Sequence, residues 1–370
     1  MNSIFNFLTT KKKPIFFIKS ILFLLVALVS FHATIWHLFT KELLATPYPY
    51  QVGDLSRLSY QTSSIYKRKI NDINLSKKHI EMRDWHGENI DIITIGDSFS
   101  NGGGGGKNPF YQDYIATQTG KNILNISSGE DGSSFAELAL MLNNNGLLKE
   151  MKVKAIILES VQRYAVGRYT QDINWDINNS KNNFLNTYKS IKTPPHKQSG
   201  ITFINNGNYH FVLNNILYSL SKKPYKKDPV YMAKLTKNMF SIKAKDTLLF
   251  YHEDINKIPD STKQNIKKLN STLNKLAKKL KKSNIKLIFM PAVDKYNLYY
   301  PYIKNNNLPK SNFFSLLRKL KKDYIFIDTK AILQPLLEKN IKDVFYSDDT
   351  HWSYKASKKV INSVAFDDIL

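Results

Sequence analysis

The feature that most restricts the fold of this chain is an alternation of short apolar runs with amphipathic segments between residues 89 and 364. The apolar runs have the length and β-branched content of buried strands, and they lie at residues 89–96, 121–126, 153–158, 285–290 and 324–328. Helical spacing of apolar residues marks other segments, at residues 135–148, 261–283, 311–322, 329–339 and 353–364. Strands that alternate with helices form a mainly parallel sheet with helices on both faces. The sequence therefore predicts an α/β fold of three layers.

A run near the N-terminus predicts a membrane span. Residues 21–39 contain no Asp, Glu, Lys or Arg, and their number is close to the roughly 20 residues that a helix needs to cross a bilayer. Lysines but no acidic residues precede this run, which predicts a cytoplasmic N-terminus. The long apolar run, followed only by Ala45 as a weak cleavage site, favours an uncleaved anchor over a signal peptide.

These features together predict how the chain is organised. We expect a cytoplasmic N-terminus (1–20), a transmembrane anchor (21–39), a stalk (40–88) and a domain (89–370) with an insertion at about 170–250. The charge pattern places the anchor in the inner membrane and the domain in the periplasm or at the cell exterior.

Composition excludes several classes of site. The chain has no cysteine, which excludes disulfides, thiolate catalysis and cysteine-ligated metals. No paired histidine spacing indicates a metal, so we expect neither a metal nor a cofactor. The formal net charge of +24 would attract anionic surfaces. Because zinc-finger spacing and a basic helix backed by heptads are both missing from the sequence, we interpret the charge as a lysine bias and expect no nucleic-acid partner.

A candidate nucleophile follows the first predicted strand. Ser98 comes directly after Gly96 and Asp97, and in folds of this kind ligands bind beyond the carboxyl ends of the strands. A serine hydroxyl needs a neighbouring base to take its proton, and backbone N–H groups in such a turn can hold an oxyanion. A Gly-Asp-Ser turn also serves as an ordinary helix cap, so the tripeptide alone does not decide between the two interpretations.

A candidate base lies before the last predicted helix. His351 has Asp348 and Asp349 close by in the sequence, and a catalytic histidine needs an acceptor that fixes its tautomer and stabilises its cation. Trp352 can shield such a pair from water. The alternative interpretation is an Asp-rich loop that caps a helix and contains an incidental histidine.

The two elements together, Gly-Asp-Ser-Phe and Asp-Thr-His-Trp, resemble those of the SGNH/GDSL hydrolase superfamily. They are most similar to its alginate O-acetyltransferase-like branch, whose members modify exported polysaccharides. The Asp-Thr-His-Trp run is typical of that branch and selects Asp349 as the acid, with Asp348 in reserve. In that branch the Asp-His element often precedes the serine, whereas Ser98 comes first here, as in ordinary SGNH hydrolases. The resemblance implies an SGNH-like fold over roughly residues 89–165 and 285–364.

The resemblance also implies further site residues. Candidate substrate-binding side chains lie in three stretches. Arg163 lies at a strand end similar to the Glu-Arg-Tyr of that branch, and Lys295 and Tyr296 lie in a stretch similar to its Pro-x-Lys-Tyr. Trp352 is the final residue of Asp-Thr-His-Trp. The expected oxyanion donors are the backbone N–H groups of Ser98 and Gly129, with Gly132 as an alternative to the latter.

The activity implied by the resemblance is O-acetyl transfer. Ser98 would accept an acetyl group and pass it to an extracytoplasmic polysaccharide, with His351 as the base and Asp349 orienting it. A multi-pass membrane partner would supply the acyl group. An esterase that acts on a glycan or lipid differs only in that water attacks the acyl-serine, so it remains an alternative. A non-catalytic glycan-binding assembly subunit is the third hypothesis.

Overall fold

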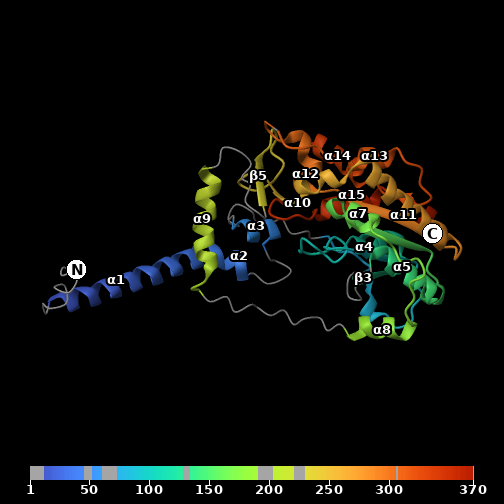
Figure 1. The fold of residues 1–370 in the computed structure, drawn as a ribbon, viewed down its shortest axis with the longest axis horizontal. Coiled ribbons are helices and arrows are strands. Elements are labelled where there is room, and N and C mark those ends of the chain that lie inside the picture. The colour runs from blue at the N-terminus through green and yellow to red at the C-terminus, as the bar shows by residue number, and fades with distance from the viewer. Residues whose placement is uncertain are drawn as a thin grey trace.

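The computed structural model describes residues 12–45, 52–60, 73–127, 134–190, 203–220, 230–305 and 307–369. Within these ranges a long N-terminal helix projects from an α/β body (Figure 1). The body is organised around a six-stranded sheet in the order β1-β3-β2-β4-β7-β8. Its strands are β1 (Ile80–Glu81), β2 (Ile92–Gly96), β3 (Ile123–Ser127), β4 (Ala155–Val161), β7 (Lys286–Ala292) and β8 (Ile325–Phe326).

Every pairing in this sheet is parallel. All residues of β2 and β4 are buried, as expected for central strands with helices on both faces. β2 and β4 are neighbours, so the turns that follow their carboxyl ends lie side by side. This placement brings Ser98 and Arg163 to the same edge of the sheet.

Two groups of helices cover the sheet. On one side α11 (Lys263–Lys281) contacts α5 (Phe135–Asn144), α7 (Gln162–Thr170) and α13 (Phe313–Arg318). On the other side α15 (Tyr354–Asn362) contacts α4 (Tyr111–Thr119) and α14 (Thr329–Glu338). The α/β fold with a mainly parallel sheet between helical layers is therefore confirmed.

Local sequence explains where the helices begin and end. Ser134 and Glu137 form a reciprocal capping box at the start of α5, and the Thr262 side chain accepts a hydrogen bond from the N–H of Asn265 at the start of α11, because free N–H groups of a first turn need acceptors. Gly146, with φ of 81°, ends the helical run that the sequence predicts to continue. The remaining short helices are α6 (Leu147–Glu150), α8 (Lys181–Ser190), α10 (Glu253–Asn256), α12 (Lys295–Tyr299) and α16 (Phe366–Ile369), with 3₁₀ turns at Met82–Asp84, Ile258–Asp260 and Tyr300–Tyr302.

The N-terminal helix is long and apolar enough to cross a membrane. α1 (Lys12–Ile35) continues through a π-helical turn (Trp36–Thr40) into α2 (Lys41–Ala45). Over Pro14–Ala45 the most apolar stretch is not buried in the chain, and Phe23 and Leu24 are more than half exposed. The predicted span at 21–39 lies within this continuous helix.

The segments predicted as stalk and insertion contain regular structure. The stalk range includes α3 (Asp54–Ser59) and the edge strand β1, and β1 pairs with β3 in the main sheet. The insertion range includes α8, α9 (Asn206–Leu220) and an antiparallel pair, β5 (Val230–Lys234) with β6 (Thr247–Tyr251). Residues 46–51 and 61–72 of the predicted stalk, and 191–202 and 221–229 of the predicted insertion, lie outside the described residues, as do residues 1–11 of the predicted cytoplasmic N-terminus.

Candidate active site

Ser98 lies in a tight turn at the carboxyl end of β2, and its exposed position there depends on Asp97. Asp97 Oδ1 accepts a hydrogen bond from the N–H of Phe99 at 3.2 Å, and Oδ2 accepts one from the N–H of Val161 at 2.8 Å. Oδ2 also pairs with Arg168. Burial alone would raise the pKa of Asp97, but Arg168 and these N–H donors hold it below its ordinary value. The ionised Asp97 therefore ties the turn to the end of β4.

The buried carboxyl group of Glu159 holds the same turn from β4. Glu159 Oε2 accepts hydrogen bonds from the N–H of Asp97 at 3.1 Å and from the hydroxyl of Ser100 at 3.0 Å. Complete burial, followed by the charge of Asp97, raises the pKa of Glu159 well above its ordinary value. The turn is thus fixed on both sides of Ser98.

The structure brings Ser98 and His351 together although 253 residues separate them in the chain. Ser98 Oγ lies 2.6 Å from His351 Nε2, and His351 Nδ1 lies 2.6 Å from Asp349 Oδ1. Burial lowers the pKa of His351, but the charge and hydrogen bond of Asp349 outweigh it, so the pKa is raised above the ordinary histidine value. This geometry is the one in which a histidine takes a serine proton and an aspartate stabilises the resulting cation.

The two neighbouring aspartates have different partners. Asp349 Oδ1 contacts the imidazole and also accepts the N–H of His351 at 3.0 Å. Asp348 Oδ2 instead accepts the N–H of Gly53 at 2.7 Å. The acid beside the imidazole is therefore Asp349, and Asp348 joins the loop to the segment before α3.

The glycine-rich loop after Ser98 packs against the histidine. The N–H of Gly103 donates a hydrogen bond to the carbonyl oxygen of Ser98 at 2.6 Å. A Cβ added to Gly103 would overlap His351 Nε2 and the Ser98 carbonyl oxygen. Gly103 thus permits a close approach that any larger residue would block.

The ring of Phe99 lies beside the imidazole and also contacts Trp352. The ring of Phe99 lies 4.7 Å from that of His351 and 4.9 Å from that of Trp352, measured between centroids. Trp352 is only 4% exposed. Shielding of the histidine from water by Trp352, and contact of Trp352 with a substrate, both stay predictions.

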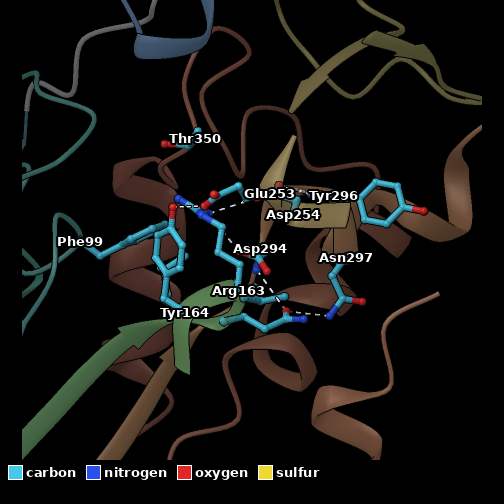
Figure 2. A network of polar contacts seen from close by, with 12 residues as sticks. Phe99, Arg163, Tyr164, Glu253, Asp254, Asp294, Tyr296, Asn297 and Thr350 are labelled. Atoms are coloured by element: carbon cyan, nitrogen blue, oxygen red, sulfur yellow. Dashed lines mark hydrogen bonds and ion pairs between the residues drawn. The ribbon is translucent and has the colours of Figure 1, made fainter. Parts of the chain in front are cut away.

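Arg163, a predicted substrate-binding residue, belongs to a buried ion-pair network that Figure 2 shows from close by. Its Nη1 lies 3.1 Å from Asp254 Oδ1 and 3.0 Å from Asp294 Oδ1. Asp254 Oδ2 also accepts the N–H of Tyr296 at 3.2 Å. This network joins the ends of β4 and β7, and it fixes the position of the guanidinium.

The other two predicted substrate-binding residues are also inside the domain. Lys295 is 1% exposed, and its Nζ donates to the carbonyl oxygens of Tyr346, Ser347 and Asp349 at 2.8–3.0 Å. Burial lowers the pKa of Lys295 to about 8. The Tyr296 hydroxyl donates to the carbonyl oxygen of Pro309 at 2.7 Å. In this structure Lys295 orders the loop that carries His351, and a direct role in substrate binding stays a prediction for both.

Comparison with known proteins bears on this arrangement. Residues 242–367 match the family model described as the SGNH hydrolase-like domain of acetyltransferase AlgX. The chain carries an AlgX-like SGNH domain. The matched range includes Asp349 and His351, whereas Ser98 lies outside it. No curated protein matches the chain.

A second carboxylate, which the sequence did not predict, lies near the imidazole. Asp54, at the start of α3, accepts hydrogen bonds from the N–H and the hydroxyl of Thr350 at 2.8 and 2.6 Å. Its Oδ2 lies 3.8 Å from His351 Nδ1, and its own N–H donates to Asp349 Oδ2 at 3.3 Å. Burial, and next the charge of Asp349, raise the pKa of Asp54. No local motif signals this contact, because it joins residues almost 300 positions apart.

Asp54, Asp349 and His351 are also a group whose ligand-type atoms all lie within 4.8 Å of one another. A metal held by these residues would keep its ligands apart at the corners of a coordination shell. Asp349 Oδ1 and His351 Nδ1 instead share a direct hydrogen bond. Their arrangement fits a histidine with two acidic neighbours.

Of the expected oxyanion donors, only Ser98 lies in the part of the chain that the structure describes. Ser98, whose N–H is one expected donor, lies in the described turn. Gly129 and its alternative Gly132 lie outside the described residues. The tip of β3 that precedes them ends at Ser127, beside the end of β2.

Proposed function

We propose that the chain is a membrane-anchored serine O-acetyltransferase that modifies an extracytoplasmic polysaccharide through an acetyl-serine intermediate. The single observation that carries the proposal is the hydrogen-bonded series Ser98–His351–Asp349. It occurs in a domain whose C-terminal part matches an acetyltransferase family. A histidine between a serine hydroxyl and a carboxylate activates that serine for acyl transfer.

The proposed reaction has two halves. Ser98 Oγ attacks the carbonyl carbon of an acetyl ester while His351 Nε2 takes the hydroxyl proton; the donor ester bond then breaks, and the imidazolium gives its proton to the leaving oxygen. A polysaccharide hydroxyl next attacks the acetyl-serine, and His351 takes its proton. The bond between Oγ and the acetyl group breaks, and the proton returns to Ser98.

The remaining groups have supporting roles in this proposal. Asp349 stabilises the imidazolium in both halves. The N–H groups of Ser98 and Gly129 would hold the oxyanion. A multi-pass membrane partner would deliver the acyl group to the outer face of the inner membrane, where α1 anchors the domain.

The test is to trap the intermediate. The purified chain treated with an activated acetyl ester should gain one acetyl group, which peptide mass spectrometry should locate on Ser98. Ser98→Ala should gain none there, and Ser315→Ala, which removes an exposed hydroxyl elsewhere, should react as the wild type does. Absence of acetyl-Ser98 in a folded wild type would reject both the transferase and the esterase, and would leave the non-catalytic assembly subunit.

An SGNH-type esterase is the second candidate, because Ser98 is solvent-exposed and water could reach an acetyl-serine there. The two enzymes are separated by the fate of that intermediate. Transfer of label from acetyl-Ser98 to an oligosaccharide would support the transferase. Release of free acetate alone across a panel of oligosaccharides would support the esterase.

A further inference from the structure

The outer face of α9 carries an exposed apolar stripe that the proposed chemistry does not use. Each of its members lies three or four residues from another member, so they share one side of the helix. They are between 39% and 75% exposed; these residues are Tyr209, Leu213, Ile216, Leu217 and Leu220. An exposed apolar surface of this kind marks a contact with a membrane or a partner.

α9 lies across the end of α1 (Figure 1), and a buried polar contact fixes the crossing. The Asn208 side chain donates to His32 Nδ1 and accepts from the Thr40 hydroxyl. His32 is 1% exposed, so Asn208 satisfies a polar group that would otherwise be buried unpaired. Gly207 allows the close approach, because a Cβ there would overlap Leu44.

Ring contacts show which way the apolar stripe faces. Tyr209, a member of the stripe, stacks on Phe31 at 5.3 Å between centroids. Phe211, on the other side of α9, stacks on Phe39 at 4.8 Å. Phe31 precedes Phe39 along the helix, so the stripe faces the N-terminal, apolar part of α1. That part of α1 is itself exposed, and the two apolar surfaces therefore adjoin.

We propose that α9 lies in the outer interface of the bilayer that α1 crosses, with its apolar stripe against the lipid. This inference rests on the anchoring role of α1 in the proposed function. A helix that crosses the end of a membrane span, with one apolar side facing back along that span, has the geometry of an interfacial amphipathic helix. Lipid is favoured over a protein partner because the stripe adjoins the exposed surface of α1.

The arrangement would set the height of the active site above the membrane. On its inner side α9 holds the end of α3, since Asn214 and Asn215 donate to the carbonyl oxygens of Ser59 and Tyr60. α3 in turn carries Asp54, which binds the loop of His351. The lipid contact is thus connected to the candidate site by one short helix.

The experiment uses the absence of cysteine from the chain. Single nitroxide labels are placed through Leu217→Cys on α9, Ile341→Cys on the distant body and Leu25→Cys in α1. Leu217 and Ile341 are equally exposed, at 39% each, so they form a matched pair. The full chain is reconstituted in vesicles of phosphatidylcholine and phosphatidylglycerol, and collisions with oxygen are compared with collisions with an aqueous nickel chelate.

Lipid contact predicts a ratio of oxygen to nickel collisions several-fold higher at 217 than at 341, and approaching the ratio at 25. Equal ratios at 217 and 341, with the label at 25 in lipid, would overturn the α9 inference and leave the anchor standing. An aqueous label at 25 would reject the anchor and the inference together. Spin–spin broadening at 217 that disappears on dilution with unlabelled chain would assign the stripe to a second copy. None of these outcomes depends on acetyl transfer.

A different observation supports a second inference, which concerns Asp54. We infer that Asp54 is a positioning residue that holds Thr350, and through it the orientation of His351. The charged groups with the largest effects on the pKa of His351 are Asp349, Asp54 and Arg163. Asp54→Asn removes one negative charge while keeping an oxygen for the N–H of Thr350.

The measurement is an NMR titration of isotope-labelled histidine, assigned with His351→Gln. The pKa of His351 should fall in Asp54→Asn, because a carboxylate that stabilises the imidazolium has been lost. The acidic limb of any acetyl-transfer profile should then move to lower pH. Asp84→Asn, which changes a side chain that is 65% exposed, should leave the His351 pKa unchanged. An unchanged His351 pKa in folded Asp54→Asn would overturn the inference, and the titration itself needs no activity.

Discussion

The turn that carries Ser98 and the loop that carries His351 are held in place by different means. The Ser98 turn is fixed by groups of its own sheet, namely Asp97 and Glu159 at the ends of β2 and β4. The His351 loop is held by Lys295 from α12, by Gly53 and by Asp54 at the start of α3. The Ser98 turn is therefore held by the central strands of the sheet, whereas the position of His351 depends on segments distant in the chain.

This difference predicts which substitutions damage the fold and which damage only the site. Loss of a support in the Ser98 turn should lower the free energy of unfolding of the whole domain. Loss of a support in the His351 loop should disturb the histidine more than the domain. Four substitutions, with expected effects on stability that decrease from Asp97→Asn to Ser353→Ala, test this contrast.

Asp97→Asn should have the largest effect on stability. It leaves Arg168 near the core without its charge partner, which costs about 3–5 kcal/mol of unfolding free energy. Because the folded pKa of Asp97 is depressed, its contribution to wild-type stability is present above the unfolded value of about 3.9 and is lost as pH falls through the folded pKa. Urea unfolding between pH 7 and pH 3 measures both effects. A variant as stable as the wild type at pH 7 would contradict the core role of this turn.

Lys295→Met should lower the free energy of unfolding of the domain by less than Asp97→Asn does, and it should disturb the His351 loop more. It leaves the carbonyl oxygens of Tyr346, Ser347 and Asp349 without their shared donor, which lowers the free energy of unfolding by about 2–4 kcal/mol. This loss is partly offset because a buried ammonium group no longer has to be desolvated. Hydrogen exchange should rise in residues around 346–351 and stay unchanged in β2 and β4. Uniformly faster exchange across the sheet would show that the loop and the core unfold together.

Gly103→Ala probes the contact between the two parts. The added methyl group overlaps His351 Nε2, and an overpacked contact of this kind costs about 1–3 kcal/mol. Acetylation of Ser98 by an activated ester should fall by about 100-fold, because proton transfer by a positioned base contributes on that scale. Gly87→Ala is not a suitable control, since Gly87 has a φ of 108° that strains any side chain. Gly167→Ala is suitable, because nothing lies within 4 Å of the added Cβ, and its acetylation rate should equal that of the wild type.

The sequence predicts the two motifs and the sheet beneath them because each has a local signature. The strands are short apolar runs, and Ser98 and His351 lie in motifs that resemble a known family. The residues that hold the His351 loop have no such signature. In the sequence, Asp54 is an ordinary acidic residue at a helix start, and Lys295 is predicted to bind substrate. The apolar periodicity also predicted too late an end for α5, because Gly146, in the left-handed conformation, stops the helix although the apolar pattern continues. Distant contacts made by residues outside these motifs, such as that of Asp54 with Thr350, are thus what the sequence failed to predict.

Ser353→Ala should have the smallest effect of the series, and it locates the end of the His351 loop. Ser353 caps α15 by accepting the N–H of Lys355 at 3.2 Å, and loss of a helix cap of this type costs about 1 kcal/mol. Because His351 is held by Asp349 and not by Ser353, acetylation of Ser98 should stay within about twofold of the wild-type rate, while the midpoint of urea unfolding falls slightly. A large loss of acetylation with only this small loss of stability would mean that α15, through its cap, positions His351. α15 would then have to be counted among the distant segments that hold the His351 loop, in contrast to the central strands that hold the Ser98 turn.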